Sequence, residues 1–399
     1  MSGHMNEWLN LVIRWMHLIA GISWIGSSFF FMWLDSHLES PPPEKEDVSG
    51  ELWMVHSGGF YQVEKYLIKP GWVPDNLHWF KWEATFTFIT GFFLLGVVYY
   101  MGGALYLIRP DAPLPKPAIM AIGLLLLPCA WIVYDLLWNK AFKDQPKVGA
   151  AISFGLTMAV AYGLSYILSG RALFIHIGAM FGTLMVTNVW MRILPAQQQM
   201  IDATKRNEVP DYSKGERAKQ RSVHNNYMTL PVLFMMISNH FPSTYGNTYN
   251  WAVLAGMILV GAGIRHFMNV KTPFSRFTLT AAVAGAFGLF FYTAPPKAPQ
   301  ADASVTGAEV KTVSFSEVQP IIQNRCVSCH AEKPTDDIFK VAPQGAMFDT
   351  PERIKAYATQ IKARAVDAKT MPLGNKTGMK DEERVLLGRW IDQGANIDN

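Results

Sequence analysis

The sequence predicts an all-α fold in which eight transmembrane helices form a bundle and a small soluble domain follows. Half of the 399 residues are hydrophobic and only 17% are charged, whereas a soluble protein carries about 25% charged residues. Several apolar segments reach the roughly 20 residues that a helix needs to cross a bilayer. The composition then changes abruptly near residue 293. We therefore predict a membrane domain over residues 1–293, a linker over 294–312 and a soluble domain over 313–399.

Eight apolar segments are the predicted membrane spans. They cover residues 8–33, 82–108, 117–138, 148–168, 171–194, 227–245, 251–270 and 277–292. The aromatic-rich segment 35–81 is expected to pack on the membrane face as interfacial helices, and the polar segment 195–226 to form a solvated loop. The linker is rich in alanine and proline and has no apolar periodicity, which is typical of an extended connection.

Basic residues are distributed unevenly between the predicted loops. If both ends of the chain lie outside the cytoplasm, the outer loops contain only Arg109, Lys116 and Arg171, and the inner loops contain the remaining loop lysines and arginines. Cytoplasmic loops of membrane proteins carry an excess of lysine and arginine. The distribution therefore predicts that the N-terminus and the C-terminal domain lie on the outer side.

The segment 326–330, Cys-Val-Ser-Cys-His, is a C-x-x-C-H motif. This spacing is typical of covalent haem c attachment. Cys326 and Cys329 would bond to the porphyrin, and His330 would be an axial ligand of the iron. A zinc site is disfavoured because the sequence offers no second pair of ligands.

Two helices are predicted around this motif, over residues 315–324 and 381–394. Both have apolar residues at helical spacing, and the second opens with three acidic residues, which favour a helix N-terminus. The pattern predicts a small, class I-like cytochrome c domain. Met371, in a turn-rich loop and followed by proline, is the preferred second axial ligand; Met379 is the alternative, and Met347 is expected to be a packing residue.

Ionisable residues within membrane spans are candidates for a functional site. Arg14, His17, His176 and His240 fall at similar depth in the outer half of their predicted spans. They could ligate a second haem, bind an anionic substrate or relay protons, and each histidine could equally be a structural hydrogen-bonding group. Asp135, Arg265 and His266 lie near the inner ends, where the two basic side chains could reach the interface.

Four stretches carry a resemblance to a known family. They are residues 15–26 (WMHLIAGISWIG), 56–61 (HSGGFY), 225–231 (NNYMTLP) and 238–242 (SNHFP). With the eight spans, the linker and the haem motif, the whole chain resembles the membrane-bound bacterial urate oxidases fused to a C-terminal cytochrome c domain (the PuuD type). The first span is also similar to that of the HemJ-type protoporphyrinogen oxidases, in which an early histidine ligates haem b.

The resemblance implies oxidation of urate to 5-hydroxyisourate without formation of hydrogen peroxide. Electrons would leave through haem c to a terminal oxidase or a soluble cytochrome c. The protein would lie in the bacterial inner membrane, in contact with lipid, with its C-terminal domain in the periplasm and no nucleic-acid partner. Arg14 would bind the urate anion, one of His17, His176 and His240 would be the base, and His17 could instead hold a haem b.

Two other functions fit the sequence pattern. One is a different membrane dehydrogenase that passes electrons to cytochrome c, for example from a quinol. The other is a membrane-anchored electron carrier, which is disfavoured because an anchor needs one span and this chain has eight predicted spans.

Overall fold

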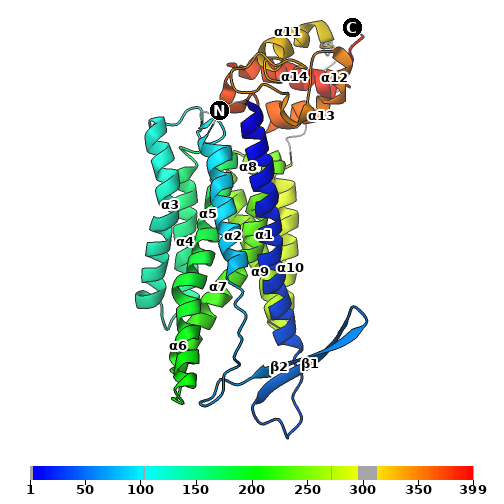
Figure 1. The fold of residues 1–399 in the computed structure, drawn as a ribbon. Coiled ribbons are helices and arrows are strands. Elements are labelled where there is room, and N and C mark those ends of the chain that lie inside the picture. Colours follow the sequence, from blue (N-terminus) through cyan, green and yellow to red (C-terminus); the bar gives the residue numbers. More distant parts are fainter. Residues whose placement is uncertain (1–2, 102–103, 271, 295–311, 399) are drawn as a thin grey trace.

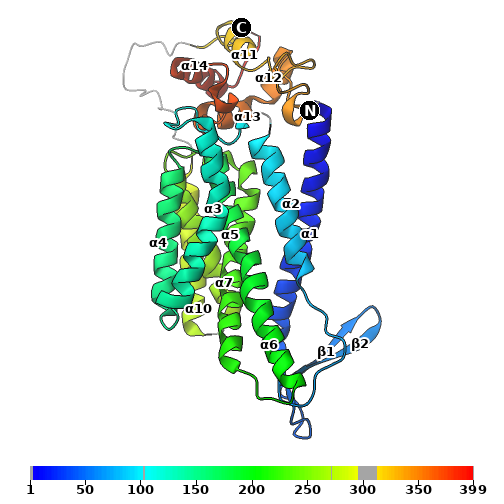
Figure 2. The same ribbon diagram turned by 60° about the vertical axis from the view of Figure 1, so that its left-hand side comes forward.

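The computed structural model describes residues 3–101, 104–270, 272–294 and 312–398, and shows a long helix bundle with a smaller helical unit at one end (Figures 1 and 2). We call the end of the bundle next to this C-terminal unit the upper end, and the opposite end the lower end. The N-terminus of the first helix also lies at the upper end (Figure 1). Most of the predicted linker, residues 295–311, lies outside the described residues.

Ten helices belong to the bundle among the described residues. They are α1 (Gly3–His37), α2 (Trp82–Leu95), α3 (Lys116–Leu136), α4 (Pro146–Leu164), α5 (Gly170–Asn188), α6 (Leu194–Lys205), α7 (Tyr212–Ile237), α8 (Pro242–Tyr245), α9 (Asn250–Asn269) and α10 (Pro273–Tyr292). Wider or tighter turns continue four of them, namely η1 (Gly96–Tyr100), η3 (Leu137–Ala141), η4 (Val189–Ile193) and η5 (Ser238–His240). Seven helices of the described chain are long and apolar enough to cross a membrane, which is consistent with a multi-pass membrane protein.

The predicted sixth span, 227–245, differs from the helix observed. α7 begins at Tyr212, and its first half is polar, so it is not among the seven apolar helices. It nevertheless packs against α5 and α9. Its charge is accommodated because Arg221, only 3% exposed, is bonded to Asp135 of α3 at 3.3 Å. The prediction of a solvated loop over 195–226 was wrong, since most of this segment forms α6 and the start of α7.

The segment expected to form interfacial helices contains a β-hairpin instead. Strands β1 (Val48–His56) and β2 (Gly59–Tyr66) pair antiparallel. Ser57 and Gly58 between them both have positive φ, 52° and 74°, as the tight turns of two-residue hairpins require. The fold is thus mostly helical, with one two-stranded sheet that the composition of the segment did not predict.

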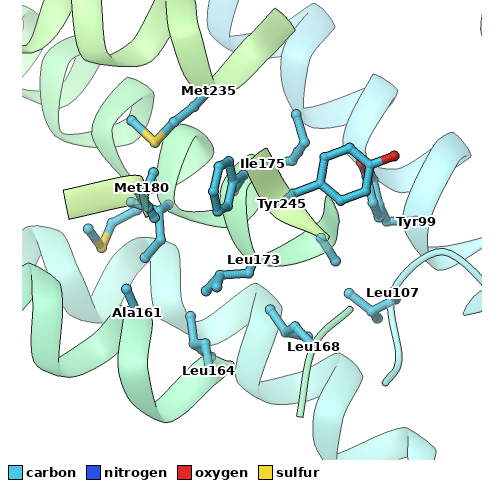
Figure 3. Packing of buried hydrophobic residues seen from close by; sticks show 14 of the residues in the cluster. Tyr99, Leu107, Ala161, Leu164, Leu168, Leu173, Ile175, Met180, Met235 and Tyr245 are labelled. Atoms are coloured by element: carbon cyan, nitrogen blue, oxygen red, sulfur yellow. The ribbon is translucent and has the colours of Figure 1, made fainter. Parts of the chain in front are cut away.

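The core of the bundle is built around α5. Leu173, Phe174 and Ile177 are fully buried there, and Tyr99 and Tyr245 lie at one edge of the same cluster (Figure 3). α1 contrasts with α5, because large apolar side chains such as Trp15 and Ile22 are each 65% exposed. Such a surface is unfavourable in water and suits contact with lipid.

The C-terminal unit has its own core. Its helices are α11 (Phe315–Arg325), α12 (Pro351–Ala356), α13 (Ala358–Ile361) and α14 (Asp381–Asp392), with the turn η7 (Lys362–Asp367) after α13. α11 packs on α14, where Trp390 is 1% exposed and its ring lies 5.6 Å from that of Phe315. Both helices predicted in this domain are confirmed, α11 ending one residue later and α14 two residues earlier than expected.

A buried carboxylate fixes the loop that follows the C-x-x-C-H motif. Asp336 accepts hydrogen bonds from the backbone N–H groups of Ile338 at 2.8 Å and Phe339 at 3.0 Å. Lys376 donates to its other oxygen at 2.6 Å. Burial alone would raise the pKa of Asp336, but these bonds outweigh burial and hold the pKa well below its ordinary value.

Asp336→Asn is expected to destabilise the C-terminal unit by about 1–3 kcal/mol at neutral pH, because the charge-assisted bonds are lost. Because the pKa of Asp336 is lower in the folded than in the unfolded state, its ionised carboxylate stabilises the folded state at pH values above the unfolded pKa of about 4. This stabilisation decreases as the pH falls from about 4 toward the lower folded-state pKa. Calorimetry from pH 7 to pH 3 should therefore show the difference between wild type and variant shrinking below about pH 4. Asp337→Asn is the control: Asp337 also contacts Lys376 but is 76% exposed, so a loss as large as that of Asp336→Asn would contradict the assignment.

Candidate functional site

Two arginines and three tyrosines meet at the upper end of the bundle. The guanidinium carbon of Arg171, at the start of α5, lies 4.7 Å from the ring centre of Tyr106 and 5.8 Å from that of Tyr99. Its Nε donates to the Tyr99 hydroxyl at 3.2 Å, and Tyr245 is close enough to interact with it electrostatically. Arg14 of α1 interacts in the same way with Arg171 and Tyr99.

Neither arginine forms an ion pair with a carboxylate in the part of the chain that the structure describes. Within the described ranges, Arg14 donates two hydrogen bonds, both to Oδ1 of Asn10, at 3.1 Å and 2.9 Å. Two neighbouring cations without acidic partners attract an anion, and guanidinium groups bind planar anions through paired hydrogen bonds. The sequence shows Arg171 only as a loop charge, because its place beside Arg14 depends on helix packing.

His17 lies one turn below Arg14 on α1 and presses against α2. Its Nδ1 lies 3.0 Å from the carbonyl oxygen of Thr87 and 3.2 Å from Oγ1 of Thr90. Gly91 allows this contact, because a Cβ at that position would lie 2.8 Å from the imidazole ring. Donation from Nδ1 to the carbonyl leaves Nε2 as the unprotonated nitrogen. His17 thus has the form of a positioned base or ligand.

His176 is fully buried, and both of its ring nitrogens are used. Nδ1 bonds to the carbonyl oxygen of Ala172 at 2.8 Å, and Nε2 lies 2.8 Å from the hydroxyl of Tyr100. Gly123 of α3 makes room for this pair, since a Cβ there would lie 2.3 Å from the Tyr100 oxygen and 3.2 Å from Nε2. His176 therefore joins α5, η1 and α3 as a satisfied hydrogen-bonding group.

Gly123→Ala is expected to destabilise the bundle by about 1–3 kcal/mol, because the added methyl group must displace Tyr100 from His176. The midpoint of thermal unfolding in detergent would measure the loss. Gly155→Ala in α4 is the matched control, since no atom lies within 4 Å of a Cβ at that position and alanine favours a helix over glycine. Equal midpoints of thermal unfolding for the Gly123 variant and wild type would show that the Tyr100–His176 pair does not depend on the space left by Gly123.

The environment of His240 differs from that of Arg14, His17 and His176. It ends the turn η5, beyond the end of α7, and its side chain is exposed. The sequence predicted it inside a span, where a buried ionisable group is costly and is therefore a candidate for a function. Of the four predicted membrane-site residues, Arg14 and His17 interact electrostatically, and His176 joins the cluster through ring contact with Tyr99 at 5.8 Å.

The C-x-x-C-H motif follows the end of α11 directly. His330 is stacked on Phe348 with 4.8 Å between ring centres, and its Nδ1 bonds to the carbonyl oxygen of Ala346 at 3.0 Å. This bond fixes the ring and directs Nε2 away from the backbone, as in histidines that ligate metals. Burial lowers the pKa of His330, so the imidazole is neutral near pH 7. Burial, aided by the nearby Cys329 thiol, raises the pKa of Cys326 to about 12.

The donor set of this motif fits a covalent haem better than a bare metal ion. No three His, Cys, Asp or Glu side chains among the described residues converge as a metal site, so a zinc knuckle is not supported. A haem needs only two axial side chains. Met371 packs at the edge of the same core as Cys326, and its carbonyl oxygen accepts a hydrogen bond from Arg384 at 2.6 Å. Met379 is 3% exposed within that core.

The bundle and the C-terminal unit touch through tyrosines. The Tyr106 ring lies 6.5 Å from that of Phe339, and Tyr106 is within electrostatic range of Cys329. Tyr245 lies close to the side chain of Thr370, the neighbour of Met371. Both tyrosines also interact with Arg171. Tyr106 and Tyr245 therefore lie between the arginine cluster and the C-terminal unit that contains the C-x-x-C-H motif.

A second polar group lies in the lower half of the bundle. Asp135 receives bonds from Arg192 and Arg221, and the Tyr134 hydroxyl lies 2.6 Å from Nδ1 of His224. Arg265 is 1% exposed and donates to Asn226 at 2.6 Å, so it is buried and does not reach the interface as expected. These charges are paired or hydrogen-bonded, which suits a structural network between helices.

A comparison with protein-family models matches residues 3–294 to the family described as urate oxidase N-terminal. Searches among curated proteins and among solved structures found no match. The matched region contains all ten helices of the bundle and ends before the C-terminal unit. Because it covers well over half of the 399 residues, the chain belongs to the urate oxidase N-terminal family.

Proposed function

We propose that this protein oxidises urate to 5-hydroxyisourate and passes the electrons through a covalently bound haem c to the respiratory chain. Membership of the urate oxidase family supports an oxidoreductase that acts on urate. The observation that supports the electron path is the position of Tyr106, which interacts with Arg171, contacts Phe339 of the C-terminal unit and is within electrostatic range of Cys329.

The reaction removes two electrons from the purine. Urate and one water give 5-hydroxyisourate, two protons and two electrons, and the water supplies the new hydroxyl group. A haem c accepts one electron at a time when it is bound, so two transfers complete each turnover and the acceptor is a terminal oxidase or a soluble cytochrome c. Oxygen is not the direct oxidant in this scheme, and no hydrogen peroxide forms.

The residues take distinct roles in the proposal. Arg14 and Arg171 attract urate, an anion at neutral pH, through guanidinium groups that have no carboxylate partner among the described residues. His17 removes a proton, because its Nε2 is available while both nitrogens of His176 are engaged. Cys326 and Cys329 would bond to the haem, with His330 and Met371 as axial ligands. The exposed His240 receives no role.

The proposed location is the bacterial inner membrane. The seven apolar helices and the exposed apolar surface of α1 support contact with lipid. The excess of lysine and arginine in the loops at the lower end supports a cytoplasmic lower end. The C-terminal unit would then lie in the periplasm, where covalent haem attachment takes place.

Anaerobic addition of urate to the purified, oxidised protein tests this function. We expect reduction of the haem c with two haems reduced per urate consumed, and no hydrogen peroxide in air. Reduction by a quinol but not by urate would favour the alternative dehydrogenase instead. A pyridine haemochrome spectrum would count the haems: one c-type haem is expected, and an additional b-type haem that disappears in His17→Ala would make His17 an iron ligand rather than the base.

A further inference from the structure

A cleft opens at the junction between the bundle and the C-terminal unit. Its volume is about 430 Å³, and three parts of the chain line it: the first turns of α1, the end of η1 with the loop at Leu105 and Tyr106, and segment 338–344 of the C-terminal unit. This volume falls in the range of about 300–1,000 Å³ that is typical of small-molecule sites. Tyr106, which contacts the C-terminal unit, is part of its wall.

The polar residues of α1 continue from this cleft into the bundle. Asn6, Asn10, Arg14 and His17 are spaced by four, four and three residues, so they lie along one face of the helix. Asn6 and Asn10 line the cleft, and Oδ1 of Asn10 accepts both hydrogen bonds from Arg14. At 1.5 Å per residue the stripe is about 16 Å long. It leads from the cleft to His17.

One polar atom in the cleft lacks the partner that its burial requires. Oδ1 of Asn6 is inaccessible and has no hydrogen-bond partner within the described ranges. A buried acceptor without a donor costs about 1–3 kcal/mol. Asn6 lines the cleft, so a ligand N–H group there would satisfy this oxygen once the Asn6 side chain turns toward the ligand. The exposed side chains of Glu7 and Lys340 also line the cleft. An entering anion therefore meets the Lys340 ammonium in the cleft and the Arg14 guanidinium deeper along α1, beyond Asn10.

We propose that this cleft is the entry site where a planar purine anion binds first, with one wall supplied by the C-terminal unit, and that the anion then moves along the polar stripe of α1 to Arg14 and His17. The proposal rests on urate oxidation as the proposed function and adds where the substrate binds. Asn6 accepts a ring N–H, Asn10 holds Arg14 toward the anion, and Tyr106 separates the ligand from the C-x-x-C-H motif. Urate therefore enters from the side of the C-terminal unit, between the two parts of the chain.

Two variants of the full-length holoprotein test the cleft from its two walls. Asn6→Ala removes the unsatisfied acceptor, and Val341→Trp narrows the cleft from the C-terminal unit at a position that is 65% exposed. Asn6→Ala is expected to raise the KM for urate and the dissociation constant in equilibrium dialysis with labelled urate by about fivefold, because one hydrogen bond contributes about 1 kcal/mol. Val341→Trp is expected to raise both constants because the larger side chain occupies space in the cleft.

Asn76→Ala is the matched control, since Asn76 is exposed in the segment between β2 and α2 and lies outside the cleft. It should leave both constants unchanged. Wild-type KM and affinity in both test variants, with normal haem c spectra and melting, would overturn the cleft proposal. A wild-type protein that binds urate through Asn6 but does not oxidise it would overturn the proposed function and leave the cleft assignment standing.

Discussion

His17→Ala is expected to lower kcat for urate oxidation by about 10²- to 10⁴-fold, the range for loss of a general base. The reason is geometric: Nδ1 is held by the Thr87 carbonyl oxygen at 3.0 Å, and Nε2 is left to accept a proton close to Arg14. The measurement is the rate of haem c reduction by urate under anaerobic conditions. The haem c absorption spectrum should be unchanged, because His17 is not part of the C-terminal unit.

His240→Ala is the control for this experiment. Its side chain is exposed beyond the end of α7, so its rate should remain within about twofold of wild type on the same assay. A wild-type rate in His17→Ala would refute the assignment of His17 as the base. A large loss in His240→Ala would show that the sequence-based grouping of the three histidines was a better guide than the hydrogen bonds described above.

Sequence patterns predicted the features that local chemistry determines. α11 and α14 were found because apolar residues at helical spacing and acidic first turns specify a helix whatever surrounds it. α7 was placed wrongly because its charged first half is stabilised by distant residues, above all Asp135 of α3, which pairs with Arg221. The hairpin was not predicted, because aromatic composition alone does not distinguish an interfacial helix from a strand; the local signal for it is the turn at Ser57-Gly58.

The candidate site was predicted only in part for the same physical reason. Arg14 and His17 share one helix, so their spacing alone placed them together. Arg171, Tyr99 and Tyr106 come from different segments, and only the packing of α5 against η1 and the following loop brings them into contact. When a single arginine lies near the end of a span, the sequence pattern does not show whether it binds an anion or only helps to set the orientation of the span in the membrane. The contacts that identify Arg171 are tertiary contacts between distant segments, which the periodicity of a sequence does not reveal.

Met371→Ala is expected to lower the reduction potential of the haem c by on the order of 0.1 V, within the roughly 0.8 V that axial ligands span. A thioether ligand favours the reduced iron and raises the reduction potential. Without the Met371 side chain, water or a weaker ligand would take its place at the iron. Potentiometric titration of the purified protein measures the change. The weak long-wavelength absorption of methionine-bound ferric haem should disappear with it.

Met379→Leu and Met347→Leu separate this ligand from the other two candidates. Met379 is 3% exposed among core residues, so leucine should cost less than about 1.5 kcal/mol of stability and leave the potential unchanged. Met347 lies beside the exposed Arg353, and its replacement should alter neither property. Met371 is the candidate whose loop is fixed on both sides, by Arg364 through the Met371 N–H at 3.0 Å and by Arg384 through its carbonyl oxygen. A weak iron–sulfur bond depends on such positioning. If the reduction potential instead falls in the Met379 variant, the axial ligand is Met379 in the core and not Met371 in the loop.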